Sequence, residues 1–468
     1  MLHSAYTVKL TAIGIVGLAM VYFLLLGSQN LTFFNMGEDG PLFVQTAKFL
    51  KTGAPSPGSP LFHLTNAGWL RVFDFGTDYG TLVILPAIYS AITAGLLYLI
   101  SRNLLAPLLW LSSGVVLSQS TILELYTLVT LLMVLSYYCH TKNNRVLAYL
   151  IIGLGITVHH TAGLGLIALI VTDFVNKNSI KPALATLIPM ILIIYVPLTN
   201  REPYYMISGH SLGDYLKYFF STAAGLLGGL ALYPTDDLVG RVWDVSRILV
   251  GGLGLTILLV ILTIKQNWKE HLLPLLMGSL PLIYYATTSD NYAYFTILPT
   301  FAFAAIIACK SEWKGVKNIC IGVCAFLIAL NILLYDFDRN DPNKTAVQFY
   351  NQLETLPEGS VLETCSCISN SIYVNMTYLH NLNNQEKNIY VVDTEFYRIP
   401  RGIGTNGKSI TEESWLSTIE IAGKENKLWR VEANSFLKGH IVPATSKEVL
   451  DNYLDRDFYK EAIRASSS

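Results

Sequence analysis

The stretch Tyr79–Ile100, YGTLVILPAIYSAITAGLLYLI, has no charged side chain and is long enough to cross a lipid bilayer as one helix. The whole chain has the same character, because 52% of its 468 residues are hydrophobic and only 14% are charged. An average soluble domain has about 25% charged residues, and one soluble core cannot bury so much apolar sequence. The net charge of −1 provides no basic surface for nucleic acid. The composition therefore predicts a polytopic membrane protein without a nucleic-acid partner.

Apolar runs flanked by charged or turn-forming residues continue along the first 335 residues. They predict about eleven transmembrane helices, at residues 10–27, 79–100, 104–117, 121–138, 147–158, 161–174, 182–198, 246–264, 273–287, 292–309 and 318–335. Several runs are shorter than the roughly 20 residues that cross a full bilayer. The runs 147–158 and 161–174 therefore predict either two short helices or one helix bent at His159–His160.

Lysine and arginine in the short loops set the expected orientation of these helices. With the N-terminus in the cytoplasm, the inner loops hold most of the basic residues, and the long outer loops 28–78 and 199–245 hold few. Eleven crossings place the C-terminal region outside, together with the sequons at Asn30, Asn343 and Asn375. We expect a multi-pass protein of the plasma or inner membrane, or of the endoplasmic reticulum in a eukaryote.

The composition changes at about residue 336, which predicts two domains: a transmembrane domain over 1–335 and an extracytoplasmic α/β domain over 336–468. In the second domain, Ser360–Leu362 and Asn388–Asp393 predict short strands, and Lys447–Ile463 predicts a terminal helix. The expected fold class is an all-α polytopic membrane protein with a small α/β domain at its C-terminus.

The first outer loop contains two adjacent carboxylates, Glu38 and Asp39, flanked by glycines. Neighbouring carboxylates raise each other's proton affinity, and desolvation at a membrane surface raises it further. Such a group is suited to take a proton from an acceptor hydroxyl near neutral pH. The alternative is a solvated acidic turn between helices.

Two further candidates follow in the chain. His63 stands after the Pro/Gly-rich stretch 54–60, where it contacts a substrate phosphate or hydrogen-bonds a neighbouring carbonyl. Glu124 stands at the start of the run 121–138, and an ionisable group at membrane depth is costly enough to indicate function. The alternative for Glu124 is a helix-start carboxylate that the helix dipole stabilises.

Imidazole, guanidinium and phenol groups complete the set of candidates. His159 and His160 interrupt an apolar hairpin, where they contact a phosphate or hold the helices together; no metal is expected, because no Cys, Asp or Glu stands at ligand spacing. In the loop 199–245, Arg201 is suited to bind a phosphate, and Tyr204 to stack on a sugar. Tyrosines are also common at membrane boundaries for packing reasons alone.

Four motifs occur in one order: Gly37-Glu38-Asp39-Gly40, Pro57-Gly58-Ser59-Pro60-Leu61-Phe62, Glu124-Leu125-Tyr126-Thr127 and Gly153 followed by His159-His160-Thr161. Together they resemble a membrane family long known as a domain of unknown function. That family includes a vertebrate endoplasmic-reticulum protein O-mannosyltransferase and bacterial relatives, and belongs to the GT-C glycosyltransferases. The chain departs from the family where Pro41 replaces a second acidic residue and Pro55 replaces a histidine.

The resemblance implies that mannose or another hexose is transferred from a polyprenyl- or dolichyl-phosphate donor to an acceptor hydroxyl, with protein Ser/Thr as the expected acceptor. It implies Glu38 or Asp39 as the base, no required cofactor or metal, and substrate contacts from His63, Glu124, Tyr126, His159, His160, Arg201 and Tyr204. Two alternatives stay open: a glycan or lipid acceptor, and a transporter or lipid-carrier translocase.

Overall fold

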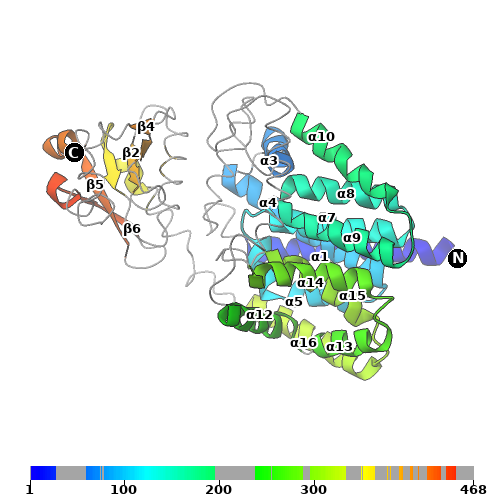
Figure 1. The fold of residues 1–468 in the computed structure, drawn as a ribbon. Helices are drawn as coiled ribbons and strands as arrows, with labels where there is room; N and C mark the ends of the chain where they lie inside the picture. The colour runs from blue at the N-terminus through cyan, green and yellow to red at the C-terminus, as the bar shows by residue number, and fades with distance from the viewer. Residues whose placement is uncertain are drawn as a thin grey trace. The chain divides into compact units, whose positions relative to one another are not determined.

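The computed structural model describes residues 2–27, 60–73, 75, 78–195, 238–254, 256–287, 296–333, 349, 351–363, 377, 380, 389–393, 401–403, 409–410, 419–433 and 439–449. These residues fall into two compact units. The first unit contains the helices and the second contains a β-sheet, and each is treated by itself (Figure 1).

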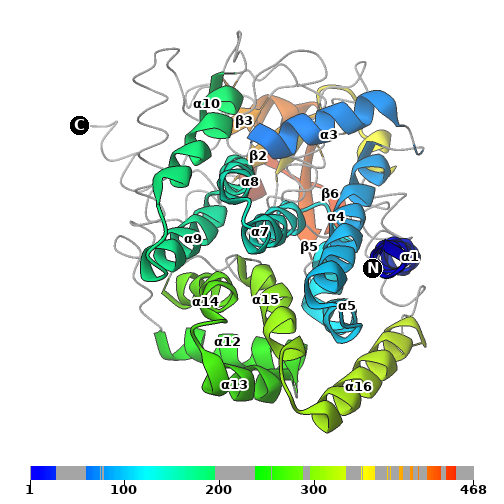
Figure 2. The ribbon, with the colours of Figure 1, turned by 90° about the vertical axis from the view of Figure 1, so that its right-hand side faces the viewer.

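Most helices of the helical unit run along a common direction, whereas α3 lies across them and α12 is bent by 99° from α13 (Figures 1 and 2). Its helices are α1 (Leu2–Leu26), α3 (Pro60–Val72), α4 (Asp78–Ser101), α5 (Leu105–Ser112), α6 (Gly114–Ser120), α7 (Tyr126–Thr141), α8 (Arg145–Val158), α9 (Gly163–Val175), α10 (Leu187–Tyr195), α12 (Leu238–Leu253), α13 (Thr256–Asn267), α14 (Leu272–Thr287), α15 (Leu298–Cys309) and α16 (Lys314–Leu333). Short 3₁₀ turns, η2 (His160–Ala162) and η3 (Lys181–Thr186), precede α9 and α10. The most extensive contacts join α7 to α8 and α14 to α15.

Three of the described helices are long and apolar enough to cross a membrane: Tyr6–Leu26, Gly80–Ser101 and Lys314–Leu333. A bent pair, α12 with α13, raises this number to four if it is one span. Several other apolar helices are shorter, including α8, α14 and α15. A helical membrane protein is therefore supported, whereas the number of eleven crossings stays a prediction.

The expected continuous helix over 246–264 is wrong. The chain bends by 99° between α12 and α13, and Gly254 in the break has a φ of +50°. Residues other than glycine rarely adopt this left-handed conformation. A right-handed helix requires a negative φ at every residue, so the positive φ of Gly254 ends α12.

Two other expected spans differ from the observed helices. The run 104–117 is divided at Ser113, whose hydroxyl accepts a hydrogen bond from the amide of Val116 and caps α6. The run 121–138 becomes helical only at Tyr126, so Glu124 precedes the helix. At His159–His160, two helices are present, because α8 ends at Val158 and η2 begins after an extended residue.

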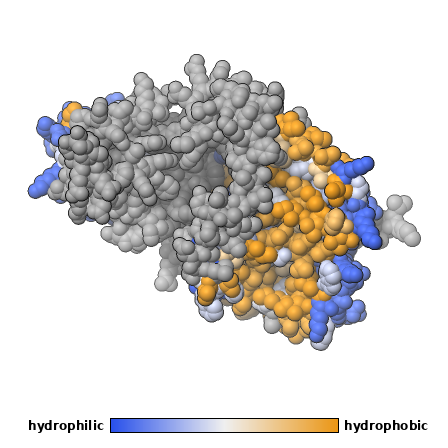
Figure 3. Space-filling model, viewed as in Figure 1, coloured by the Kyte–Doolittle hydropathy of each residue, from blue (hydrophilic) through white to orange (hydrophobic). Residues whose placement is uncertain are grey.

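The short connections on one side of the bundle carry the basic residues. These connections join α4 to α5, α7 to α8, α9 to η3, α13 to α14 and α15 to α16, and contain Arg102, Lys142, Lys177, Lys269 and Lys310. In the face shown by Figure 3, hydrophilic side chains gather at the end where α1 begins, and hydrophobic side chains cover the flank. This distribution is the one expected for a bundle in a bilayer; that the basic end faces the cytoplasm stays a prediction.

The second unit contains a six-stranded sheet of order β4-β3-β2-β1-β5-β6. Its strands are β1 (Val361–Glu363), β2 (Tyr390–Asp393), β3 (Arg401–Ile403), β4 (Ser409–Ile410), β5 (Leu428–Ala433) and β6 (Gly439–Pro443). Val361 of β1 is in parallel register with Tyr390 of β2 and Leu428 of β5, and the remaining pairs are antiparallel. The two strands predicted from sequence are confirmed as β1 and β2.

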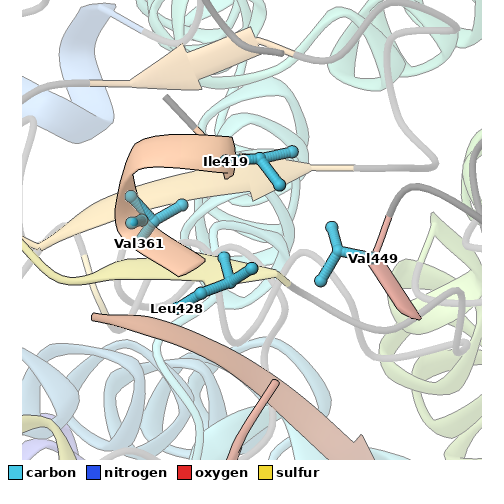
Figure 4. Packing of buried hydrophobic residues seen from close by; sticks show 5 residues of the cluster. Val361, Ile419, Leu428 and Val449 are labelled. Carbon is cyan, nitrogen blue, oxygen red and sulfur yellow. The ribbon is translucent and has the colours of Figure 1, made fainter. Parts of the chain in front are cut away.

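One face of the sheet is covered by apolar side chains from helical segments. Val361 and Leu428 on neighbouring strands pack with Ile419, Ala422 and Val449, all of which are buried (Figure 4). The predicted terminal helix begins within this core at residues 446–449, and its remaining residues lie outside the described part of the chain. The core explains why a short α/β segment is compact despite its small strands.

Candidate functional site

The interruption between α8 and α9 has a defined hydrogen-bonded geometry. We call residues 159–161 the histidine turn. His159 is extended, with φ of −158°, so its side chain caps η2: ring atom Nδ1 accepts the amide hydrogen of Thr161 at 3.4 Å. The Thr161 hydroxyl oxygen lies 2.8 Å from the same nitrogen. The ring is therefore held in place by the residue that starts the next helix.

Aromatic rings from two other helices surround the histidine turn. Tyr126, the first residue of α7, presents its ring edge to His159 with centroids 5.3 Å apart. The rings of His159 and His160 are 4.1 Å apart, and His160 Nε2 lies 3.2 Å from the Tyr284 hydroxyl in α14. The predicted candidates Tyr126, His159 and His160 are thus neighbours, and His160 connects the turn to α14.

Glu124 lies in the connection between α6 and α7, where its amide donates a hydrogen bond to the Ile122 carbonyl at 3.0 Å. Its side chain is buried. The expectation that Glu124 stands inside the start of the helix is wrong by two residues, because Leu125 is the N-cap. The position nevertheless remains at the N-terminal end of α7, where the helix dipole favours a negative charge.

The same connection contacts the end of α1. A methyl group added at Gly27 would lie 3.2 Å from Cγ2 of Thr121, so the Gly27 backbone lies close to the Thr121 side chain. Gly27 is the residue after α1, and the chain continues from it toward the acidic pair Glu38 and Asp39. The end of α1 therefore lies beside the α6–α7 connection.

His63 lies inside α3, which begins at Pro60 at the end of the Pro/Gly-rich stretch 54–60. Pro60 occupies the first position of α3, a favoured site for proline because its missing N–H has no helical partner there. Burial lowers the pKa of His63 to about 4, so the imidazole is neutral at physiological pH. One turn later, Asn66 is fully buried, and neither of its amide atoms is hydrogen-bonded within the described part of the chain. α3 packs against α8, which leads into the histidine turn.

Four of the predicted site residues, Glu38, Asp39, Arg201 and Tyr204, lie outside the described residues. Among the residues that are described, no group of three or more His, Cys, Asp or Glu side chains is arranged to hold a metal ion. The base and the guanidinium of the expected mechanism therefore stay predictions.

The sequence analysis did not identify a polar cluster that lies at the ends of α7, α8 and α9. Asp173 in α9 is fully buried and accepts hydrogen bonds from the Tyr149 hydroxyl at 3.0 Å and the Asn178 amide at 3.2 Å. His140 Nε2 is 3.1 Å and Arg145 Nε 3.7 Å from the same carboxylate. We call these five residues the Asp173 cluster. The sequence signal that could have identified the cluster is Asp173, the single carboxylate in the otherwise apolar α9.

The cluster connects the end of α7, the start of α8 and the end of α9, which is the opposite end of these helices from the histidine turn. The other four members all contact the one buried carboxylate. Its arrangement therefore fixes the helices that carry the turn rather than offering a site of its own.

Comparisons with protein-family models and with curated proteins give no match for this chain. The chemistry of the site follows from its groups: imidazole and phenol rings meet at one end of an apolar bundle, and the buried Glu124 stands two residues before Tyr126 in the chain. Such groups can form hydrogen bonds with oxygen-rich ligands.

Proposed function

We propose that this protein is a GT-C-type membrane glycosyltransferase that moves mannose or another hexose from a polyprenyl- or dolichyl-phosphate donor to an acceptor hydroxyl, with protein Ser/Thr as the acceptor. One observation carries the proposal. The motif containing Glu124 and Tyr126 and the motif containing His159 are separate in the sequence, and they meet where the Tyr126 ring packs against His159 at one end of an apolar bundle.

In the proposed reaction, Glu38 or Asp39 takes the proton from the acceptor hydroxyl. The hydroxyl oxygen attacks the anomeric carbon of the sugar from the face opposite the phosphate. The bond between that carbon and the phosphate oxygen breaks, and its electron pair leaves with polyprenyl phosphate. The configuration at the anomeric carbon is inverted.

Charge develops on the leaving phosphate, and preorganised donors that are directed at this charge lower the barrier. Arg201 supplies a cation, Tyr204 stacks on the sugar, and the histidine turn supplies hydrogen-bond donors. A phosphate monoester leaving group can be neutralised by such side chains, so the proposal includes no metal.

The test is sugar transfer in membranes supplied with polyprenyl-phosphate [¹⁴C]mannose, comparing the wild type with Glu38→Gln and Asp39→Asn. We expect one of the two variants to lose transfer while it remains folded, which identifies the base. Asp244→Asn, a substitution on an exposed face of α12, is the matched control for a lost carboxylate. Unchanged transfer in both loop variants would show that the base lies elsewhere. No transfer by the wild type, across several lipid-linked hexoses, would refute the proposal.

A lipid-carrier translocase is the second candidate, because the 99° break between α12 and α13 is typical of transporter helices. It predicts movement of an intact polyprenyl-phosphate sugar across a vesicle membrane, without release of polyprenyl phosphate. Measuring both products in one vesicle assay separates the two functions.

A further inference from the structure

The two histidines of the histidine turn have different surroundings and therefore different roles. His160 Nε2 is within hydrogen-bond distance of the Tyr284 hydroxyl, which ties the turn to α14. His159 uses Nδ1 within the turn, and no other described residue bonds to its Nε2. Residue His159 as a whole retains partial solvent exposure.

The hydrogen bond from the Thr161 amide favours one tautomer of His159. A backbone amide only donates, so this bond at 3.4 Å uses the lone pair of Nδ1, and the Thr161 hydroxyl at 2.8 Å can donate to the same nitrogen. The single proton of a neutral ring then lies on Nε2, which makes this atom a donor. Desolvation by the surrounding helices, with a smaller contribution from His160, lowers the pKa of His159 well below its usual range. The titratable groups beside the ring are Tyr126 and His160, with Tyr284 beyond them.

We propose that His159 binds an oxygen of the donor's phosphate as a neutral imidazole, through its Nε2–H, and that His160 is a positioning residue that holds the turn. This inference rests on the proposed glycosyl transfer. It assigns to His159 a hydrogen bond that strengthens as the leaving phosphate gains charge. It leaves the positive charge at the phosphate to other residues.

The first test needs no activity. Full-length protein is labelled with ¹⁵N-histidine in detergent micelles, and the His159 signal is identified by its loss in His159→Gln. At pH 7 we expect a neutral ring whose proton is on Nε2. A doubly protonated ring, or a proton on Nδ1, would overturn the assignment.

The second test measures transfer from polyprenyl-phosphate mannose by the wild type, His159→Ala and His159→Gln. We expect kcat/KM to fall roughly tenfold to hundredfold in His159→Ala, which corresponds to the net free energy of one hydrogen bond to a charged group. His159→Gln retains an N–H donor near the position of Nε2 and should recover part of the loss. His440→Gln, on an exposed position of β6, is the matched histidine control.

The pH profile of the wild type separates a neutral donor from a cation. A cationic imidazole would lose its proton as the pH rises through about 6.5, and kcat/KM would fall. We expect no falling limb between about pH 6 and 8. If His159→Ala transfers sugar as fast as the wild type, this inference is overturned and the proposed function still stands. A wild type without transfer would remove both.

Discussion

Asp173→Asn is the substitution that best tests the packing of the helical unit. The change keeps the size of the side chain and removes its negative charge. The amide nitrogen that replaces one oxygen is a donor: facing the Asn178 amide it makes a contact between two donors, and facing Tyr149 it forces the hydroxyl to turn and accept. The charge partner Arg145 remains at the start of α8.

The expected loss can be estimated from these contacts. Breaking a buried ion pair typically costs 3–5 kcal/mol, but the Arg145 side chain is 27% exposed and water can solvate it. A hydrogen bond to a charged group contributes about 1.5–3 kcal/mol. We therefore expect Asp173→Asn to lower the free energy of unfolding by about 2–4 kcal/mol. Tyr149→Phe removes one of the same bonds and should cost about 1–2 kcal/mol.

Unfolding in mixed micelles, followed by tryptophan fluorescence, measures these differences. The double variant of Asp173 and Tyr149 should lose less than the sum of the single losses, because the two groups share one hydrogen bond. Asp244→Asn is the control; its carboxylate is exposed and 3.7 Å from Arg247, so a change below about 0.5 kcal/mol is expected. An Asp173→Asn variant as stable as this control would refute the view that the cluster holds the three helices together.

Three other outcomes follow from described contacts. In Gly153→Ala, the new methyl group would lie 2.5 Å from the Thr186 carbonyl oxygen, so α8 and η3 must separate; the same unfolding assay should show a loss of about 1–3 kcal/mol. The backbone amide and hydroxyl of Thr445 donate to Glu448 and lower the pKa of its carboxyl group. The stabilisation is therefore present above about pH 4.3 and is lost as the pH falls through the lower, folded pKa; an NMR titration that shows an ordinary Glu448 pKa would contradict this. Tyr284→Phe removes the hydroxyl that bonds the second histidine of the turn, so melting should show a loss of about 1 kcal/mol, and an unchanged melting temperature would argue against the bond.

The sequence predicts elements whose pattern is local. The uncharged run 79–100 matches α4 within two residues, because its length and composition alone require a helix in a bilayer. The strands β1 and β2 were found from their β-branched and aromatic residues. Local signals also existed for two features that were missed: Pro60 as the first residue of α3, and Ser113 as the cap of α6.

Features that depend on distant partners could not be predicted. β5 is the strand that pairs with β1, although β2, β3 and β4 lie between them in the chain, and no periodicity reports such a register. The contact between His160 and Tyr284 likewise joins two segments that are far apart in the chain, the histidine turn and α14. For the candidate site, the sequence named Tyr126 and His159 separately, and only the structure shows that their rings touch.

The position of β1 in the sheet has a consequence for the order of events during synthesis. β1 is an interior strand, and one of its two parallel neighbours is β5, which the ribosome makes much later. Parallel pairing over such a separation in the chain closes slowly, because a long loop must be ordered before the contact forms. The helices up to α16 are complete before β5 exists, so the sheet forms only after the helical unit has been made. Until then, β1 presents an unpaired edge, and this interval is when the protein is most exposed to aggregation and proteolysis.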